Sequence, residues 1–147
     1  MDKTTRYIEL ALFITLLLIY AFTSYQRNLI WKDDLSLWTD NVVKSPSDPR
    51  AHQYLGLAYQ NAGDFDSAIK EYKKSLSLNP FQADVHNNIG VSYFYKGDID
   101  TAINHFKHAL SLNPSDRDAH YNLGIAYGEK GMFDRAQEEM SKGMTPR

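Results

Sequence analysis

Histidines are the side chains in this sequence whose type and spacing could carry chemistry. His105 and His108 are three residues apart, so on a helix they would share one face and could bind a metal ion together. The sequence contains no cysteine, which excludes thiolate ligands, thiol nucleophiles and disulfides. It has no phosphate-binding loop, dinucleotide-binding glycine run or Ser-His-Asp arrangement. We therefore expect a protein that is not an enzyme, with no catalytic residue, no metal site and no cofactor.

The other three histidines recur at a fixed interval. His52, His86 and His120 follow one another every 34 residues, which is typical of a packing position rather than a shared ligand cluster. A whole set of positions recurs with them. The second unit contains equivalent residues at all of these positions, and the third unit contains them as far as Met140. The first copy of this set is His52, Leu55, Gly56, Tyr59, Ala68, Tyr72 and Pro80. The tetrapeptide Ser-Leu-Asn-Pro also appears twice, at 77–80 and 111–114.

This spacing is that of the tetratricopeptide repeat, so residues 49–147 resemble the tetratricopeptide repeat (TPR) family. The resemblance implies an all-α solenoid in which antiparallel helix pairs bury their apolar faces by stacking. About three helix-pair repeats are expected, at residues 49–82, 83–116 and 117–147. The second helix of the last repeat is more polar than its counterparts, so we expect either that it is its own cap or that a partner covers it.

Two glycine positions in each unit have separate predicted roles. Gly90 and its equivalents lie in a helix, where glycine costs about 1 kcal/mol relative to alanine, so they predict a close approach by the paired helix. We expect Ala102 and its equivalents to be the small residues opposite them. Gly97 and its equivalents fall where the first helix should stop, in the left-handed conformation. Pro80 and Pro114 should end the second helices.

The amino-terminal segment is strongly apolar. Residues 7–25 read YIELALFITLLLIYAFTSY, and Glu9 is their only charge. A helix of this length spans about 30 Å, which matches the hydrocarbon core of a bilayer. The pattern predicts a transmembrane anchor over residues 1–25 in a single-pass membrane protein. The alternatives are a cleaved signal peptide and a buried core helix. The short tail before the segment favours repeats on the extracytoplasmic (periplasmic) side.

Residues 26–48 carry a trace of a further repeat. Trp38 and Pro46 lie 34 residues before Tyr72 and Pro80. Leu35, Trp38 and Val42 also form an apolar helical stripe. This segment is predicted to be an amphipathic connector, or half repeat, that packs on the first full repeat.

The junction between anchor and repeats has a second resemblance. An apolar helix, then Gln-Arg-Asn, Trp31, Asp33-Asp34, Leu37-Trp38 and the repeats, is similar to the carboxyl end of polytopic, repeat-bearing glycosyltransferase-like membrane proteins. In that family the repeats are extracytoplasmic. The multi-helix catalytic part has no counterpart here, so the resemblance implies location rather than activity. It leaves a fragment or accessory subunit of such an enzyme as the alternative function.

The first helices of the repeats should line a concave groove, by resemblance to the family. The predicted partner-binding residues in that groove are Gln53, Leu57, Asn87, Val91, Phe94, Tyr95, Tyr121 and Ile125. Large aromatic side chains on a groove favour binding, unless Phe94 and Tyr95 pack against neighbouring helices instead. The Lys, Asn and Arg set with which chaperone-binding members hold a carboxylate terminus is absent, which disfavours an acidic-tail ligand.

The charge balance limits the class of partner. The net charge is −2, and no strongly basic field is available for nucleic acid. Neither nucleic acid nor a small-molecule substrate is expected. The sequence predicts a membrane-anchored scaffold that binds a protein partner, as a subunit or assembly factor of a larger membrane complex.

Overall fold

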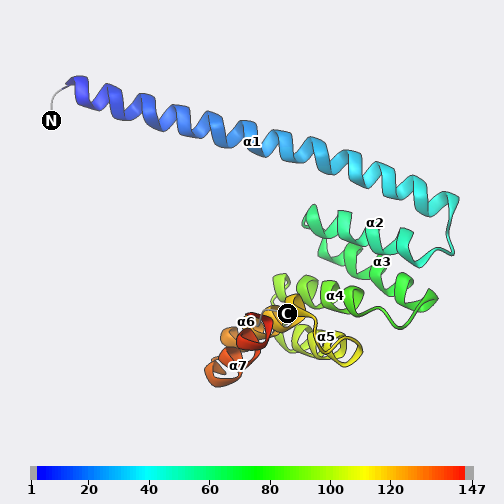
Figure 1. Ribbon diagram of the computed structural model, residues 1–147. Coiled ribbons are helices and arrows are strands. Elements are labelled where there is room, and N and C mark those ends of the chain that lie inside the picture. Colours follow the sequence, from blue (N-terminus) through cyan, green and yellow to red (C-terminus); the bar gives the residue numbers. More distant parts are fainter. Residues whose placement is uncertain (1–2, 145–147) are drawn as a thin grey trace.

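The computed structural model describes the backbone of residues 3–144 and the side chains of residues 12–23, 25 and 34–144. Over that range the fold is all-α (Figure 1). The helices are α1 (Lys3–Lys44), α2 (Pro49–Asn61), α3 (Phe65–Leu78), α4 (Ala83–Tyr95), α5 (Ile99–Leu112), α6 (Arg117–Glu129) and α7 (Phe133–Met144). The helices α3 and α5 end just before Pro80 and Pro114, as expected for residues that cannot continue a helix.

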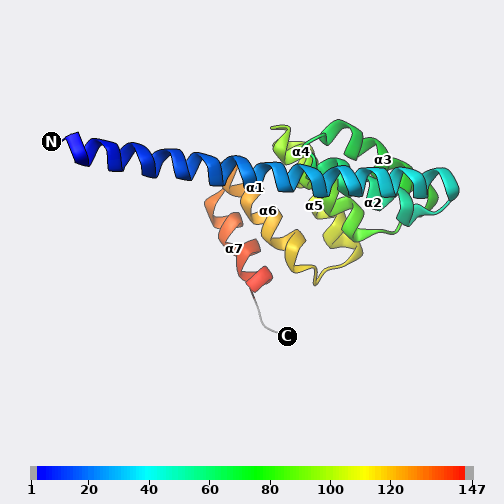
Figure 2. The ribbon, with the colours of Figure 1, turned by 90° about the horizontal axis from the view of Figure 1, so that it is seen from above.

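Helices α2 to α7 form three pairs that stack into a short solenoid (Figures 1 and 2). Each pair packs on the next through its second helix, so that α3 contacts α4 and α5 contacts α6. The first helices α2, α4 and α6 also contact one another in sequence, whereas α3, α5 and α7, as far as they are described, do not. The first helices therefore line the inner, concave side of the stack.

The turn within each pair is set by a glycine followed by a cap. Gly63, Gly97 and Gly131 have positive φ values of 82°, 83° and 70°, so the left-handed conformation predicted for them is confirmed. In the first two turns an aspartate follows and caps the second helix. Asp64 accepts a hydrogen bond from the backbone N–H of Ser67 at 3.0 Å. These short turns force the two helices of a pair to run antiparallel.

The mid-helix glycines permit the close approach that their cost predicted. A large side chain lies nearest to each glycine, and at Gly124 the expected alanine is the next neighbour, with the Ala136 carbonyl oxygen 3.1 Å from an added Cβ. A Cβ added at Gly90 would lie 2.5 Å from the Phe106 ring, and one added at Gly56 would lie 2.7 Å from the Tyr72 ring. In the third pair the nearest atom is Cγ of Met140, also at 2.7 Å. In each pair, the large residue four positions after the recurring alanine therefore occupies the space that the glycine leaves.

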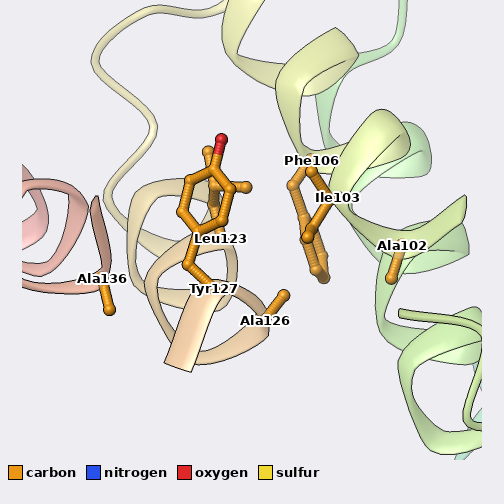
Figure 3. Close-up of a cluster of buried hydrophobic side chains, with 7 residues drawn as sticks. All are labelled: Ala102, Ile103, Phe106, Leu123, Ala126, Tyr127 and Ala136. Atoms are coloured by element: carbon orange, nitrogen blue, oxygen red, sulfur yellow. The ribbon is translucent and has the colours of Figure 1, made fainter. Parts of the chain in front are cut away.

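The core runs continuously across the repeat boundaries. Figure 3 shows Phe106 and Ile103 of α5 facing Leu123 and Tyr127 of α6. Ala136 of α7 closes the same cluster from the other side of α6. A second cluster joins α3 to α4 in the same way and contains Ala68, Tyr72, Val85 and Ile89. Each pair thus buries its apolar face only by packing on the next pair.

Helix α1 continues without a break through the predicted anchor and connector. Its last turns pack on α2, as α3 packs on α4. There the Trp38 ring stacks on Tyr54 with 4.5 Å between the ring centroids. The amino-terminal part projects away from the repeats in both views (Figures 1 and 2).

The projecting part of α1 exposes large apolar side chains, including Leu16 and Leu18 at 65% and 63% of their full accessible area. Within the residues that the structure describes, no helix has both the length and the apolar character needed to cross a membrane. The predicted span of residues 7–25 lies partly outside that range, because the side chains of residues 7–11 and 24 are not described.

Candidate functional site

The concave side of the solenoid contains a small pocket between the second and third repeats. Its volume is about 90 Å³. Helix α4 supplies Val91, Phe94 and Tyr95, and α6 supplies Asn122 and Ile125. Phe106 of α5 forms the remaining wall. Four of the predicted groove residues, Val91, Phe94, Tyr95 and Ile125, thus come together around one opening.

The two aromatic residues of α4 have different environments. Phe94 is half-buried and packs against the core cluster that contains Phe106. Tyr95 is 68% exposed, although its ring stacks on Phe65 of the first repeat at a centroid distance of 5.3 Å. Phe94 therefore has a large packing role, whereas most of the Tyr95 surface is open to a ligand.

The other predicted groove residues lie outside the pocket wall. Tyr121 on α6 is 49% exposed. Asn87 on α4 is buried and accepts a hydrogen bond from Nδ2 of Asn122 at 3.0 Å, so it orients a pocket residue from behind. Gln53 and Leu57 belong to α2, and the Gln53 amide donates to the Asp84 carboxylate. These contacts tie neighbouring first helices together beside the pocket.

Two pocket residues were absent from the predicted set. Phe106 lies on a second helix, and it reaches the concave side because Gly90 leaves room for its ring. Asn122 follows Tyr121 and turns towards Asn87 across the repeat boundary. The sequence signal was Gly90, which predicts a close approach by α5 but does not say which residue of α5 faces it.

A polar layer at the boundary between the first two repeats holds the inner helices in register. The Tyr72 hydroxyl donates to Oε1 of Gln60 at 2.8 Å, and the Ser92 hydroxyl donates to the same oxygen at 3.2 Å. Burial raises the pKa of Tyr72, which keeps its hydroxyl a donor. This layer fixes α2, α3 and α4 next to the pocket.

Two of the recurring histidines contact a glutamate on the paired helix. His52 contacts Glu71 through Nδ1 at 2.7 Å and the Pro46 carbonyl through Nε2 at 3.0 Å. His120 makes the equivalent contacts with Glu139 at 2.7 Å and Pro114 at 2.9 Å.

Burial of Glu71 by itself would raise its pKa, but hydrogen bonds from Lys74 and His52 outweigh this effect and lower the pKa. Among the described residues, no group of three or more His, Asp or Glu side chains is arranged to hold a metal ion.

Three family models match the repeats. Two are described as "Tetratricopeptide repeat" and match residues 49–81 and 118–145. The third is described as "TPR repeat" and matches residues 90–131.

Curated relatives match parts of the chain. It is 30% identical over 73 residues to Protein O-mannosyl-transferase Tmtc3 of Drosophila melanogaster, which is 50% of this chain and 8% of that protein. It is 49% identical over 37 residues to the human RANBP2-like and GRIP domain-containing protein 1, which is 25% of this chain and 2% of that protein. The chain thus spans a tenth or less of the length of these relatives.

Solved structures share the fold over a greater length. MamA matches with a TM-score of 0.71 and 26% identity, over 78% of this chain and 67% of that one. The second TPR of Spaghetti (RPAP3), bound to an HSP90 peptide, matches with a TM-score of 0.64 over 66% of this chain and 90% of that one. The identity in this second match is 18%, so it supports the fold alone. Over residues 49–81 and 90–145, therefore, this chain is built of tetratricopeptide repeats.

Proposed function

We propose that this protein is a membrane-anchored scaffold whose repeats hold a protein partner in the pocket between α4 and α6. The observation that carries the proposal is the pocket itself, where an apolar wall lies beside the exposed Tyr95. A second exposed tyrosine, Tyr121, lies one helical turn before the pocket residue Ile125 on α6. Exposed aromatic rings next to an apolar depression are typical of binding hot spots. A volume of about 90 Å³ suits one aliphatic side chain of the partner rather than a whole cofactor.

The anchor proposal rests on the exposed apolar length of α1. Nine residues between Leu10 and Phe22 are Leu, Ile or Phe. At roughly −0.3 to −0.6 kcal/mol each, they contribute about −3 to −5 kcal/mol to insertion into a bilayer. Projecting from the repeats into water, those of these side chains that the structure describes, from Leu12 to Phe22, would form an unusually large exposed apolar surface. Insertion of residues 7–25 removes that cost.

A scaffold anchored in this way would serve as a subunit or assembly factor of a larger membrane complex, with its repeats on the extracytoplasmic side. The orientation can be measured cleanly because the sequence has no cysteine. A Ser115→Cys variant places one thiol on an exposed turn between α5 and α6. A membrane-impermeant maleimide should label it in intact cells. Labelling only after the membrane is opened would contradict the proposed orientation.

The binding proposal is tested by capture from membranes in mild detergent. A Tyr95→Ala, Tyr121→Ala double variant should lose the co-purifying partner with a near-normal melting temperature, because Tyr95 is mostly exposed and Tyr121 is about half exposed. Asn104→Ala, at an exposed position of α5 on the outer helix layer, is the matched control and should retain the partner. Equal capture by wild type and double variant would refute the proposed site.

The second candidate function is an accessory subunit or fragment of a repeat-bearing glycosyltransferase-type membrane enzyme. The similarity to the O-mannosyl-transferase Tmtc3 supports it, although that match covers only 8% of the transferase. The same capture experiment separates the two functions. Polytopic glycosyltransferase subunits among the co-purified proteins would favour this second candidate, and other membrane-complex subunits would favour the first.

A further inference from the structure

The central repeat departs from its neighbours at two equivalent positions. In the outer repeats the recurring histidine faces a glutamate, Glu71 or Glu139, which is held in turn by a lysine three residues on. The equivalents in the central repeat are His105 in place of glutamate and His108 in place of lysine. An ion-paired group is thus replaced by a cluster of three histidines, His86, His105 and His108.

The three imidazole rings lie in direct contact across the α4–α5 pair. Nδ1 of His86 is 3.3 Å from Nδ1 of His105. The His86 ring also stacks on His108, with 4.0 Å between the centroids. Tyr93 of α4 stacks on His105 at 5.7 Å. Lys73 of α3 adds a positive charge that acts on His105, and no carboxylate takes the place of Glu71 or Glu139 in this cluster.

Protonation has opposite consequences in the two kinds of repeat. In the outer repeats both ring nitrogens of histidine face oxygen acceptors, so a doubly protonated ring satisfies both contacts. In the central repeat one of the facing nitrogens must lack a proton to accept the hydrogen bond. Each added proton also places positive charge beside other basic groups. Burial, together with His108 and His105, lowers the pKa of His86 to about 4.

The helices that carry this cluster also build the pocket. Helix α4 bears both His86 and the pocket residues Val91, Phe94 and Tyr95. Helix α5 bears His105, His108 and the pocket residue Phe106. Separation of α4 from α5 would therefore disturb the pocket wall.

We propose that acidification below neutral pH favours an opened, protonated form of the histidine cluster, in which the α4–α5 pair is loosened and binding at the pocket is weakened. The scaffold then releases its partner in an acidic environment. This inference rests on the proposed function for its consequence, whereas the loosening of α4 and α5 stands by itself.

The expected size follows from linkage. Because the pKa of His86 is depressed from 6.5 to about 4, the unfolded chain binds protons more readily between these values, and stability falls as pH falls. For His86 alone, lowering the pH from 7 to 5 should favour unfolding by about 20-fold. The outer repeats provide an internal comparison, because their histidines face carboxylates.

The experiment uses the full chain in mild detergent at pH 7 and pH 5. Urea unfolding gives the change in the unfolding equilibrium, and amide hydrogen exchange locates it along the chain. The test variant is a His105→Glu, His108→Lys double substitution, which restores the residues of the outer repeats. A second variant, His86→Gln, removes the depressed ring and decides the question if the first does not fold. Methyl NMR of Val91 and Ile125 reports on the pocket.

The wild type should lose stability at pH 5, with loss of exchange protection in α4 and α5 but not in α6 and α7. Both variants should respond much less, and the methyl signals should shift with pH only in the wild type. An equal pH response in wild type and variants, or none in the wild type, would overturn the inference. Partner capture at pH 7 is measured separately, so failure of the proposed function can be distinguished from failure of the pH-dependent loosening of α4 and α5.

Discussion

Replacement of Gly90 by alanine tests the helix pairing of the central repeat with a single methyl group. The new Cβ would lie 2.5 Å from Cε1 and 2.7 Å from Cδ1 of Phe106. Ordinary contacts between carbons begin near 3.5 Å, so the ring must move by about 1 Å. Phe106 is only 1% exposed and forms part of the core cluster, so it has little room to do so. Overpacking of this kind typically costs about 1–3 kcal/mol.

Gly128 provides the matched control for the same substitution. It also lies in a helix, but an added Cβ would meet nothing within 4 Å. Alanine is favoured over glycine in a helix by about 1 kcal/mol, and this gain applies at both positions. Gly128→Ala should therefore be neutral or stabilising, and Gly90→Ala should be less stable than Gly128→Ala by about 1–3 kcal/mol.

Urea or thermal unfolding followed by circular dichroism, with the full chain in detergent, measures this difference. At roughly 4 °C per kcal/mol, the two melting temperatures should differ by several degrees. Equal melting temperatures for the two variants would refute the close approach of α4 to the Phe106 ring. The inward position of Phe106 on the pocket wall would then also be wrong.

Three further perturbations test separate parts of the structure. Asp116→Ala should lower the free energy of unfolding by about 1 kcal/mol, because the Asp116 carboxylate caps α6 through hydrogen bonds from the N–H groups of Asp118 and Ala119 at 3.1 Å; no change in urea unfolding would exclude the cap. Glu71→Gln should flatten the acid limb of the stability curve, because the pKa of Glu71 is lowered below 4.5 and its stabilisation is lost as pH falls through the folded value; an unchanged profile below pH 5 would show that Glu71 is not the group responsible. Deletion of residues 1–25 should release the protein from membranes washed with alkaline carbonate, whereas the full chain should stay in the pellet. Release of the full chain by the same wash would contradict the proposed anchor.

The repeat architecture could be predicted from the sequence because each recurring position has one dominant physical role. Gly97 and its equivalents occupy the left-handed turn as expected, and the proline positions follow the ends of α3 and α5. The groups opposite the mid-helix glycines could not be assigned in this way. Alanine and the aromatic one turn later both lie on the facing side of the helix, and only the three-dimensional packing shows that the Phe106 ring fills the space.

The candidate site was partly accessible to the same reasoning. The resemblance to the repeat family placed Val91, Phe94, Tyr95 and Ile125 on the groove, and these four line one pocket. The resemblance could not separate Phe94 from its neighbour Tyr95, because both lie at positions that the family uses to line the groove, and only the packing shows that Phe94 turns to the core.

The sequence reasoning does not predict the contact of His86 with His105 and His108. His105 and His108 were recognised as a pair on one helix face, but His86 belongs to the other helix of the pair. The 19-residue interval from His86 to His105 matches that from His52 to Glu71, and this was the signal that could have revealed the contact.

Site-specific photo-crosslinking on intact membranes tests the binding claim most directly. A photoreactive amino acid is placed in turn at Tyr121 and Tyr95 beside the pocket, and at Asn104 on the outer helix α5. The same partner protein should be crosslinked from Tyr121 and Tyr95 but not from Asn104, and an Ile125→Lys substitution in the pocket should abolish both products. Crosslinking from Asn104 alone, or products at Tyr121 and Tyr95 that persist with Ile125→Lys, would contradict a partner held in the concave pocket.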